Sequence, residues 1–167
     1  IYGKTIGVLG LGAIGKGVVK RASGFDMKIY GYDIVRDDAF LQEHHVMFSD
    51  VDTIIRECDF ISLHLPLTAE TRHILNKNNL AQAKKNLIIV NTARGGLIDE
   101  DDLYVLLKEN KIYGLGLDVF EQEPLESSLL LTLPNVIVSS HTAASSQGAI
   151  NAMSTMAVDN LIQSLEQ

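Results

Sequence analysis

The sequence predicts a single α/β domain with a doubly wound, parallel, Rossmann-type sheet over residues 1–167, and three observations support this fold class. Short apolar runs alternate with helical patterns along nearly the whole chain, which is typical of right-handed βαβ crossovers. The apolar runs are almost uninterrupted, as expected for strands buried on both faces. Between the first such run and the first helical pattern stands a glycine pattern of the form G-x-G-x-x-G, at residues 10–15.

Each expected element has its own signal. The apolar runs predict strands at residues 5–9, 28–32, 60–63, 87–90, 113–117 and 136–139. The stretches with helical spacing predict helices at residues 13–23, 51–57, 77–83, 100–109 and 146–165. Residues that favour helix ends stand at several of these boundaries, with Asp50, Asn76 and Asp99 as N-caps and Gly24 as a C-cap. Residues 34–49 are polar and their pattern is ambiguous. They could form a short helix and a weak strand near residues 46–47.

Composition and charge exclude several classes of protein. With 14 Lys and Arg against 21 Asp and Glu the net charge is −7, so no nucleic-acid partner is expected. No apolar run approaches the ~20 residues that a membrane span needs, and no signal peptide precedes the first strand, so we expect a cytoplasmic protein without a membrane partner. The single cysteine, Cys58, stands at the entrance to an expected strand and is predicted to be a buried thiol. We predict no metal site.

The glycine pattern predicts a dinucleotide cofactor, because it stands in the strand–turn–helix context of the Rossmann fingerprint. Gly10 permits the tight turn, Gly12 lets the backbone approach a pyrophosphate, and Gly15 lets the helix pack on the strand. The helix N-terminus then offers free N–H groups to the phosphates. Asp33 ends the second strand, roughly 20 residues further on, where a carboxylate binds ribose hydroxyls. A carboxylate repels a 2′-phosphate, so we predict NAD rather than NADP, although the nearby Arg36 could soften this preference.

Ionisable residues follow three of the expected strands at their carboxyl ends, which is where ligands bind in sheets of this kind. Arg94 follows one strand, a group of carboxylates follows the next, and His141 follows the last. A histidine can accept a hydroxyl proton, an arginine can hold a carboxylate through two hydrogen bonds, and a carboxylate can orient the histidine. This set of side chains suits the oxidation of a hydroxy acid.

Spacing leaves several alternatives open. Any of Asp118, Glu121 and Glu123 could be the partner of the histidine. His64 also ends a strand and is the closest rival as the base. The arginine and the histidine could themselves be ordinary loop residues.

Five segments resemble the D-isomer-specific 2-hydroxyacid dehydrogenases, and the resemblance covers nearly the whole chain in order and in spacing. The segments are residues 2–15, 63–68, 91–96, 118–124 and 140–143. The resemblance implies an oxidoreductase that transfers a hydride between NAD and a small D-2-hydroxy acid or 2-keto acid. It also implies a catalytic set, since the family uses the arginine after N-x-A, the second glutamate of D-V-F-x-x-E-P and the histidine of x-P-H-x-A. These residues are Arg94, Glu123 and His141 here.

The resemblance further implies a set of cofactor contacts. Ala13 and Ile14 would contact the pyrophosphate, Asp33 the ribose and Asp118 the nicotinamide carboxamide. Other residues would line the cofactor site, namely Leu65, Thr92, Ala93, His141, Ala143 and Ala144.

The chain departs from the family pattern at Ser140, where a proline usually precedes the catalytic histidine. Proline would stiffen this turn, so its absence raises the question of what holds the loop. Family members also have a substrate domain made from both ends of a longer chain, and residues 1–167 correspond to the cofactor domain alone. We therefore expect this chain to bind NAD without useful turnover, because part of the substrate site and of the water-excluding cleft would be missing.

Two functions remain as hypotheses at this stage. The leading one is an enzyme that acts on a small 2-hydroxy or 2-keto acid, with D-3-phosphoglycerate as the first candidate, and that forms a homodimer as the family usually does. The alternative is an NAD-sensing, corepressor-like binding module of the same family.

Overall fold

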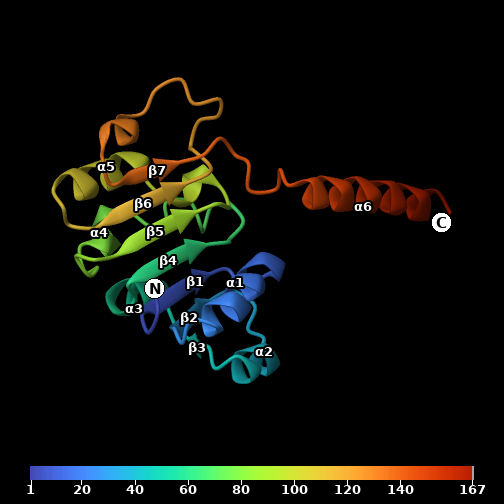
Figure 1. Cartoon of the computed structure of the whole chain (residues 1–167), viewed down its shortest axis with the longest axis horizontal. Helices are drawn as coiled ribbons and strands as arrows, with labels where there is room; N and C mark the ends of the chain where they lie inside the picture. Colours follow the sequence, from blue (N-terminus) through green and yellow to red (C-terminus); the bar gives the residue numbers. More distant parts are fainter. Residues whose placement is uncertain (167) are drawn as a thin grey trace.

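A computed structural model describes residues 1–166, which form a seven-stranded sheet in which every pair of neighbouring strands is parallel (Figure 1). The strand order is β3-β2-β1-β4-β5-β6-β7. The strands are β1 Thr5–Leu9, β2 Lys28–Tyr32, β3 Met47–Phe48, β4 Phe60–Leu63, β5 Ile88–Asn91, β6 Gly114–Leu117 and β7 Val136–Val138. This arrangement confirms the predicted doubly wound fold, and the direction of winding reverses between β1 and β4, where such sheets bind dinucleotides.

Helices pack on both faces of the sheet (Figure 1). The helices of the chain are α1 Ala13–Ser23, α2 Asp38–Glu43, α3 Val51–Glu57, α4 Lys77–Leu80, α5 Glu100–Lys108 and α6 Gln147–Leu165, with short 3-10 turns η1 Gly95–Leu97 and η2 Leu129–Thr132. All but α6 belong to the body of the domain. Side chains along β1 alternate between two separate cores. Val8 packs with residues of α1 and α2 such as Val19 and Phe40, whereas Leu9 belongs to the larger core that includes Ile54 of α3.

The predicted helix caps are confirmed by their hydrogen bonds. The side chain of Asp50 accepts the backbone N–H of Thr53 at 2.7 Å, and that of Asp99 accepts the backbone N–H of Asp102 at 3.0 Å. Asn76 forms a reciprocal capping box with Asn79, and Gly24 ends α1. These caps satisfy N–H groups that a helix cannot pair internally.

Several boundaries differ from the prediction. The helix after Asn76 ends at Leu80 instead of residue 83, because the N–H of Ala83 turns back to the Leu80 carbonyl and a second turn at Lys84 leads into the next strand. Strands β5 and β6 begin one residue later than expected, and β7 ends one residue earlier. The ambiguous residues 34–49 contain both a short helix, α2, and a short strand, β3.

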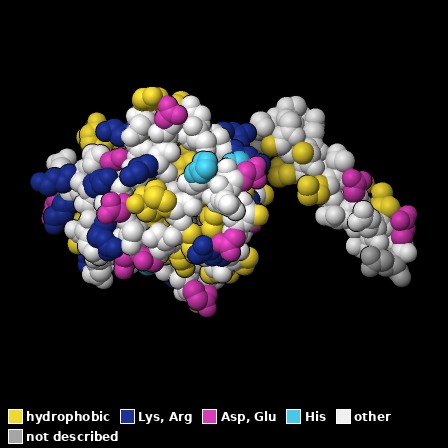
Figure 2. Space-filling model, turned by 90° about the horizontal axis from the view of Figure 1, so that it is seen from below, with side chains coloured by type: hydrophobic (Ala, Val, Ile, Leu, Met, Phe, Trp, Pro, Cys, Tyr) yellow, Lys and Arg dark blue, Asp and Glu magenta, His cyan; other side chains and the backbone are white. Residues whose placement is uncertain are grey.

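Helix α6 projects away from the body of the domain, and none of its residues is buried (Figures 1 and 2). Its exposed side chains include large apolar ones, which are Ile150, Met153, Met156, Val158, Leu161, Ile162 and Leu165. Within residues 1–166, no helix has both the length and the apolar character needed to cross a membrane.

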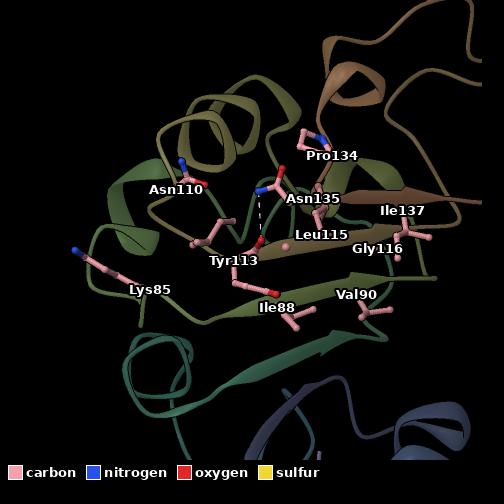
Figure 3. Close-up of a pocket in the computed structure, with 12 residues that line it drawn as sticks. Lys85, Ile88, Val90, Asn110, Tyr113, Leu115, Gly116, Pro134, Asn135 and Ile137 are labelled. Carbon is pink, nitrogen blue, oxygen red and sulfur yellow. Dashed lines mark hydrogen bonds between the residues drawn. The ribbon is translucent and has the colours of Figure 1, made fainter.

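Part of one sheet face is also open. The register of the strands places Val90, Gly116 and Ile137 on the face that α1 covers at β1. A hollow of about 660 Å³ lies over this part of the face, and Figure 3 shows that Tyr113 and Asn135 lie between Lys85 on one side and Ile137 on the other. Asn135 donates a hydrogen bond to the Tyr113 carbonyl there at 3.2 Å.

Candidate active site

The glycine loop makes a sharp turn at the point where the winding of the sheet reverses. Gly10 has φ +103°, and a Cβ atom at this residue would lie 2.5 Å from the backbone carbon of His64. A Cβ on Gly15 would lie 1.8 Å from the Gly10 carbonyl oxygen. Only glycine fits either place without a shift of the backbone, which confirms the tight turn predicted at Gly10 and the close helix packing predicted at Gly15. The close approach of Gly10 to the residues after β4 is an addition from the structure.

Asp33 connects the end of β2 to this loop. Its Oδ2 accepts the backbone N–H of Leu11 at 2.6 Å, and its Oδ1 accepts that of Val35 at 3.2 Å. The carboxylate therefore lies at the mouth of the glycine loop, as the fingerprint predicts.

The start of α1 has the features of a phosphate site. Gly12 is the N-cap and provides no side-chain cap, so the first N–H groups of the helix are left without a partner inside it. Nothing lies within 4 Å of the place where a Gly12 side chain would begin. These residues fit a dinucleotide, since a helix N-terminus with free N–H groups suits a pyrophosphate. That the pyrophosphate lies at Ala13 and Ile14 and a ribose at Asp33 stays a prediction.

The turn after β5 presents Arg94 and is shaped by a residue to which sequence reasoning gave no role. Asn91 is fully buried, and its side chain donates to the Arg94 carbonyl at 2.8 Å and accepts the N–H of Ala93 at 3.1 Å. The guanidinium of Arg94 donates to the Ala93 carbonyl at 2.6 Å. A buried amide at the end of a strand, just before a charged residue, is the sequence signal that could have identified Asn91.

The three carboxylates after β6 have different hydrogen-bond partners, and Glu123 is the one that contacts His141. Its Oε2 lies 2.7 Å from Nδ1 of His141, and its Oε1 accepts the backbone N–H of Phe120 at 2.9 Å. The hydrogen bond with His141, and next that with Phe120, hold the pKa of Glu123 below its usual range. Glu121 turns instead toward Arg72 and His73.

Asp118 holds the loop that carries His141. Its Oδ1 accepts the Ser139 hydroxyl at 2.5 Å and the backbone N–H of Thr142 at 2.9 Å, and its Oδ2 accepts the backbone N–H of Ala143 at 2.8 Å. Burial raises the pKa of Asp118, but these hydrogen bonds outweigh it, and the pKa lies below its usual value. The loop thus has an anchor on each side of Ser140, where the family pattern has proline. The contact of Asp118 with a carboxamide stays a prediction.

His141 itself has a strained backbone, with φ +56°. This left-handed conformation is uncommon outside glycine, and such residues gather at functional sites. A cavity of about 600 Å³ adjoins the histidine and is lined by Glu123 and Asp118 on the polar side and by apolar residues such as Leu125 and Val138. This cavity is distinct from the hollow on the open sheet face, whose lining contains none of the predicted site residues.

The remaining predicted residues lie just after the carboxyl ends of the strands, as expected for a ligand site in such a sheet. Leu65 follows β4, Thr92 and Ala93 follow β5, and Ala143 and Ala144 follow β7, so all are at the carboxyl edge. Their cofactor contacts stay predictions. His64, the rival base, pairs with the Ser62 hydroxyl at 2.8 Å, and burial lowers its pKa. Cys58 is fully buried, as predicted, and burial raises its pKa to about 12.

Asp118→Asn is expected to destabilise the protein by about 1–3 kcal/mol, because the amide NH₂ would face a backbone N–H that has lost its acceptor. The carboxylate has a lowered pKa in the folded state, so its contribution is present above pH ~4 and is lost as pH falls through the folded-state pKa. Urea unfolding of both proteins at pH 7 and pH 3 measures this. The difference in free energy of unfolding should shrink at pH 3, and equal stability at pH 7 would contradict the anchoring role.

The fold and the site together define the NAD-binding domain of an oxidoreductase. Residues 1–143 match the family model described as D-isomer specific 2-hydroxyacid dehydrogenase, NAD binding domain, and the chain belongs to this family. Its cofactor is NAD, in agreement with the prediction from the glycine loop and Asp33.

Characterised relatives share this domain but differ in name. D-3-phosphoglycerate dehydrogenase of Methanocaldococcus jannaschii is 49% identical over 162 residues, which cover 96% of this chain and 31% of that protein. Glyoxylate reductase of Korarchaeum cryptofilum is 44% identical over 163 residues, covering 97% of this chain and 49% of that protein. The structure of a glyoxylate reductase from Paecilomyes thermophila superposes with a TM-score of 0.92 at 35% identity, covering 99% of this chain and 50% of that one. The chain thus spans half or less of these relatives.

Proposed function

We propose that this chain is the cofactor domain of an NAD-dependent dehydrogenase that interconverts a small D-2-hydroxy acid and the corresponding 2-keto acid. The observation that supports this most strongly is the Glu123–His141 pair, 2.7 Å apart, at the same sheet edge as Arg94. Strands β5, β6 and β7 are adjacent and parallel, so the loops that leave them share one edge. When bound, NAD supplies the acceptor for a hydride.

The pairing with Glu123 determines which nitrogen of His141 can act as a base. A carboxylate accepts hydrogen bonds only, so Nδ1 carries the proton that lies between the two side chains. Nε2 then has a free lone pair and takes the hydroxyl proton during oxidation. Glu123 stabilises the imidazolium that results, and in reduction the same nitrogen returns the proton to the carbonyl oxygen.

Arg94 has the complementary role of binding the substrate carboxylate. Arg94 is exposed, and within the described residues its guanidinium has one hydrogen bond, to the neighbouring Ala93 carbonyl. The planar guanidinium can form two parallel hydrogen bonds to a carboxylate. Such a clamp would fix the C2 oxygen for proton transfer to His141.

Relatives support D-3-phosphoglycerate as the first candidate substrate, since the relative with that name is 49% identical, but glyoxylate reductases follow closely at 44%. The greater lengths of these relatives support the proposal that a substrate domain completes the active enzyme. The family resemblance further leads us to propose a homodimer in the cytoplasm. Assays of the full-length gene product with NADH and a panel of 2-keto acids test the activity. NAD binding without turnover of any of them would favour the corepressor-like alternative.

Residues 1–167 are expected to bind NAD with little or no turnover. Titration calorimetry measures binding, and Asp33→Asn should weaken it about 10- to 100-fold, since a hydrogen bond to a charged group is worth ~1.5–3 kcal/mol. Asp38→Asn is the matched control, because Asp38 pairs with Arg36 on the surface. Absence of NAD binding, or turnover by this chain at the rate of the full-length protein, would contradict the proposal.

A further inference from the structure

The carboxylate of Glu121 joins three segments of the chain beside the candidate active site. Its Oε2 lies 3.2 Å from Nη2 of Arg72 and 3.1 Å from Nε2 of His73. Its Oε1 accepts the backbone N–H of Glu100, at the start of α5, at 3.3 Å. In return, Glu100 Oε1 accepts the backbone N–H of Glu121 at 2.7 Å. Glu121 is two residues from Glu123, so these contacts hold the loop that carries the partner of His141.

His73 extends these contacts to the loop of Arg94. Its backbone N–H donates to the Gly96 carbonyl at 2.8 Å, in the turn directly after Arg94. Its Nδ1 lies 3.3 Å from Oδ2 of Asp99, the N-cap of α5. Both ring nitrogens therefore face carboxylates, and the imidazolium can donate to both of them, whereas the neutral ring can donate to only one.

The two loops also touch directly. A Cβ atom on Gly95 would lie 1.9 Å from the backbone carbon of Phe120 and 2.3 Å from the backbone nitrogen of Glu121. The backbone after Arg94 thus packs against the backbone before Glu123 with no space between them. A shift in one loop must therefore move the other.

Negative charge dominates this cluster. Burial raises the pKa of Glu100, the backbone N–H of Glu121 lowers it, and the charges of Glu121 and Asp101 raise it, so that the net shift is upward. The guanidinium of Arg72 supplies positive charge that faces Glu121, and the ring of His73 lies against the same carboxylate. The arrangement depends on these two pairings.

We propose that Glu121 and His73 are positioning residues, which hold the loop of Glu123 in a fixed position relative to the loop of Arg94. This inference rests on the proposed function. Partly exposed ion pairs contribute only ~0–1 kcal/mol to stability, whereas a misplacement of ~1 Å can slow a reaction ~10²-fold. Loss of the contact therefore acts mainly on turnover.

Steady-state kinetics of the full-length protein test this inference with Glu121→Gln, His73→Asn and the double variant. Asparagine suits position 73 because His73 has φ +50°, a conformation that asparagine tolerates. Each single variant is expected to lower kcat at least tenfold, and the double variant no further, since both changes break one connection. The Kd for NAD should stay within twofold. Glu126→Gln is the matched control, an exposed glutamate nearby.

A kcat within twofold of the parent for Glu121→Gln, or additive losses in the double variant, would overturn the inference. So would a loss of kcat that follows a loss of folded protein in urea unfolding. If the parent protein itself turns over no 2-keto acid, the proposed function fails, and hydrogen exchange of residues 118–124 then decides the inference alone. Faster exchange in Glu121→Gln and in His73→Asn than in Glu126→Gln supports the inference, and unchanged exchange overturns it.

Discussion

His141→Asn is expected to lower kcat of the full-length protein by about 10²–10⁴-fold, the range that general acid–base groups contribute. The reason is the free Nε2, which the contact of Nδ1 with Glu123 at 2.7 Å leaves as the proton acceptor. Asparagine tolerates the left-handed backbone and cannot take the proton. NAD binding should be nearly unchanged.

His45→Asn is the matched control for this variant. His45 has φ +52°, close to the +56° of His141, and is exposed on the loop after α2. The control separates loss of the imidazole at the site from the effect of asparagine in a left-handed conformation. Stopped-flow measurement of NADH consumption gives the rates. A kcat for His141→Asn within tenfold of the parent would exclude His141 as the base.

Arg94→Gln is expected to lower kcat/KM by about 10²–10³-fold, mainly through a higher KM for the keto acid. Removal of one partner of a hydrogen-bonded charge pair costs ~2–5 kcal/mol. Arg94→Lys should recover only part of the lost kcat/KM, because an ammonium group cannot form the two parallel hydrogen bonds of the guanidinium. The measurement is the dependence of initial rate on keto acid concentration at saturating NADH.

Arg36→Gln is the control for the arginine change, since Arg36 forms an exposed pair with Asp38 at 2.6 Å. It should leave the KM for the keto acid unaltered. An unchanged KM in Arg94→Gln would show that the substrate carboxylate binds elsewhere.

The sheet and its helices could be predicted from the sequence because each element has a local signal. Helix α3 begins and ends at the predicted residues, since Asp50 caps its N–H groups and an apolar strand follows closely. The prediction for the helix after Asn76 was three residues too long, because its end depends on turns that bring the chain to β5. Boundaries set by tertiary contacts leave little trace in local sequence.

The candidate site was predictable in its location but not in its internal pairing. Asp118, Glu121 and Glu123 lie within a few residues of one another, and spacing cannot show which carboxylate turns toward His141. The path of the loop decides this, since Glu121 faces Arg72 and Asp118 accepts N–H groups of the histidine loop. The family resemblance had indicated Glu123, and the geometry agrees with that choice.

The most direct test is a crystal structure of the full-length protein with NAD and a 2-keto acid. We expect both carboxylate oxygens of the acid on the Arg94 guanidinium and the C2 oxygen within hydrogen-bond distance of His141 Nε2, with Nδ1 still on Glu123. A keto acid carboxylate bound away from Arg94, or an imidazole turned away from the C2 oxygen, would contradict the proposed chemistry.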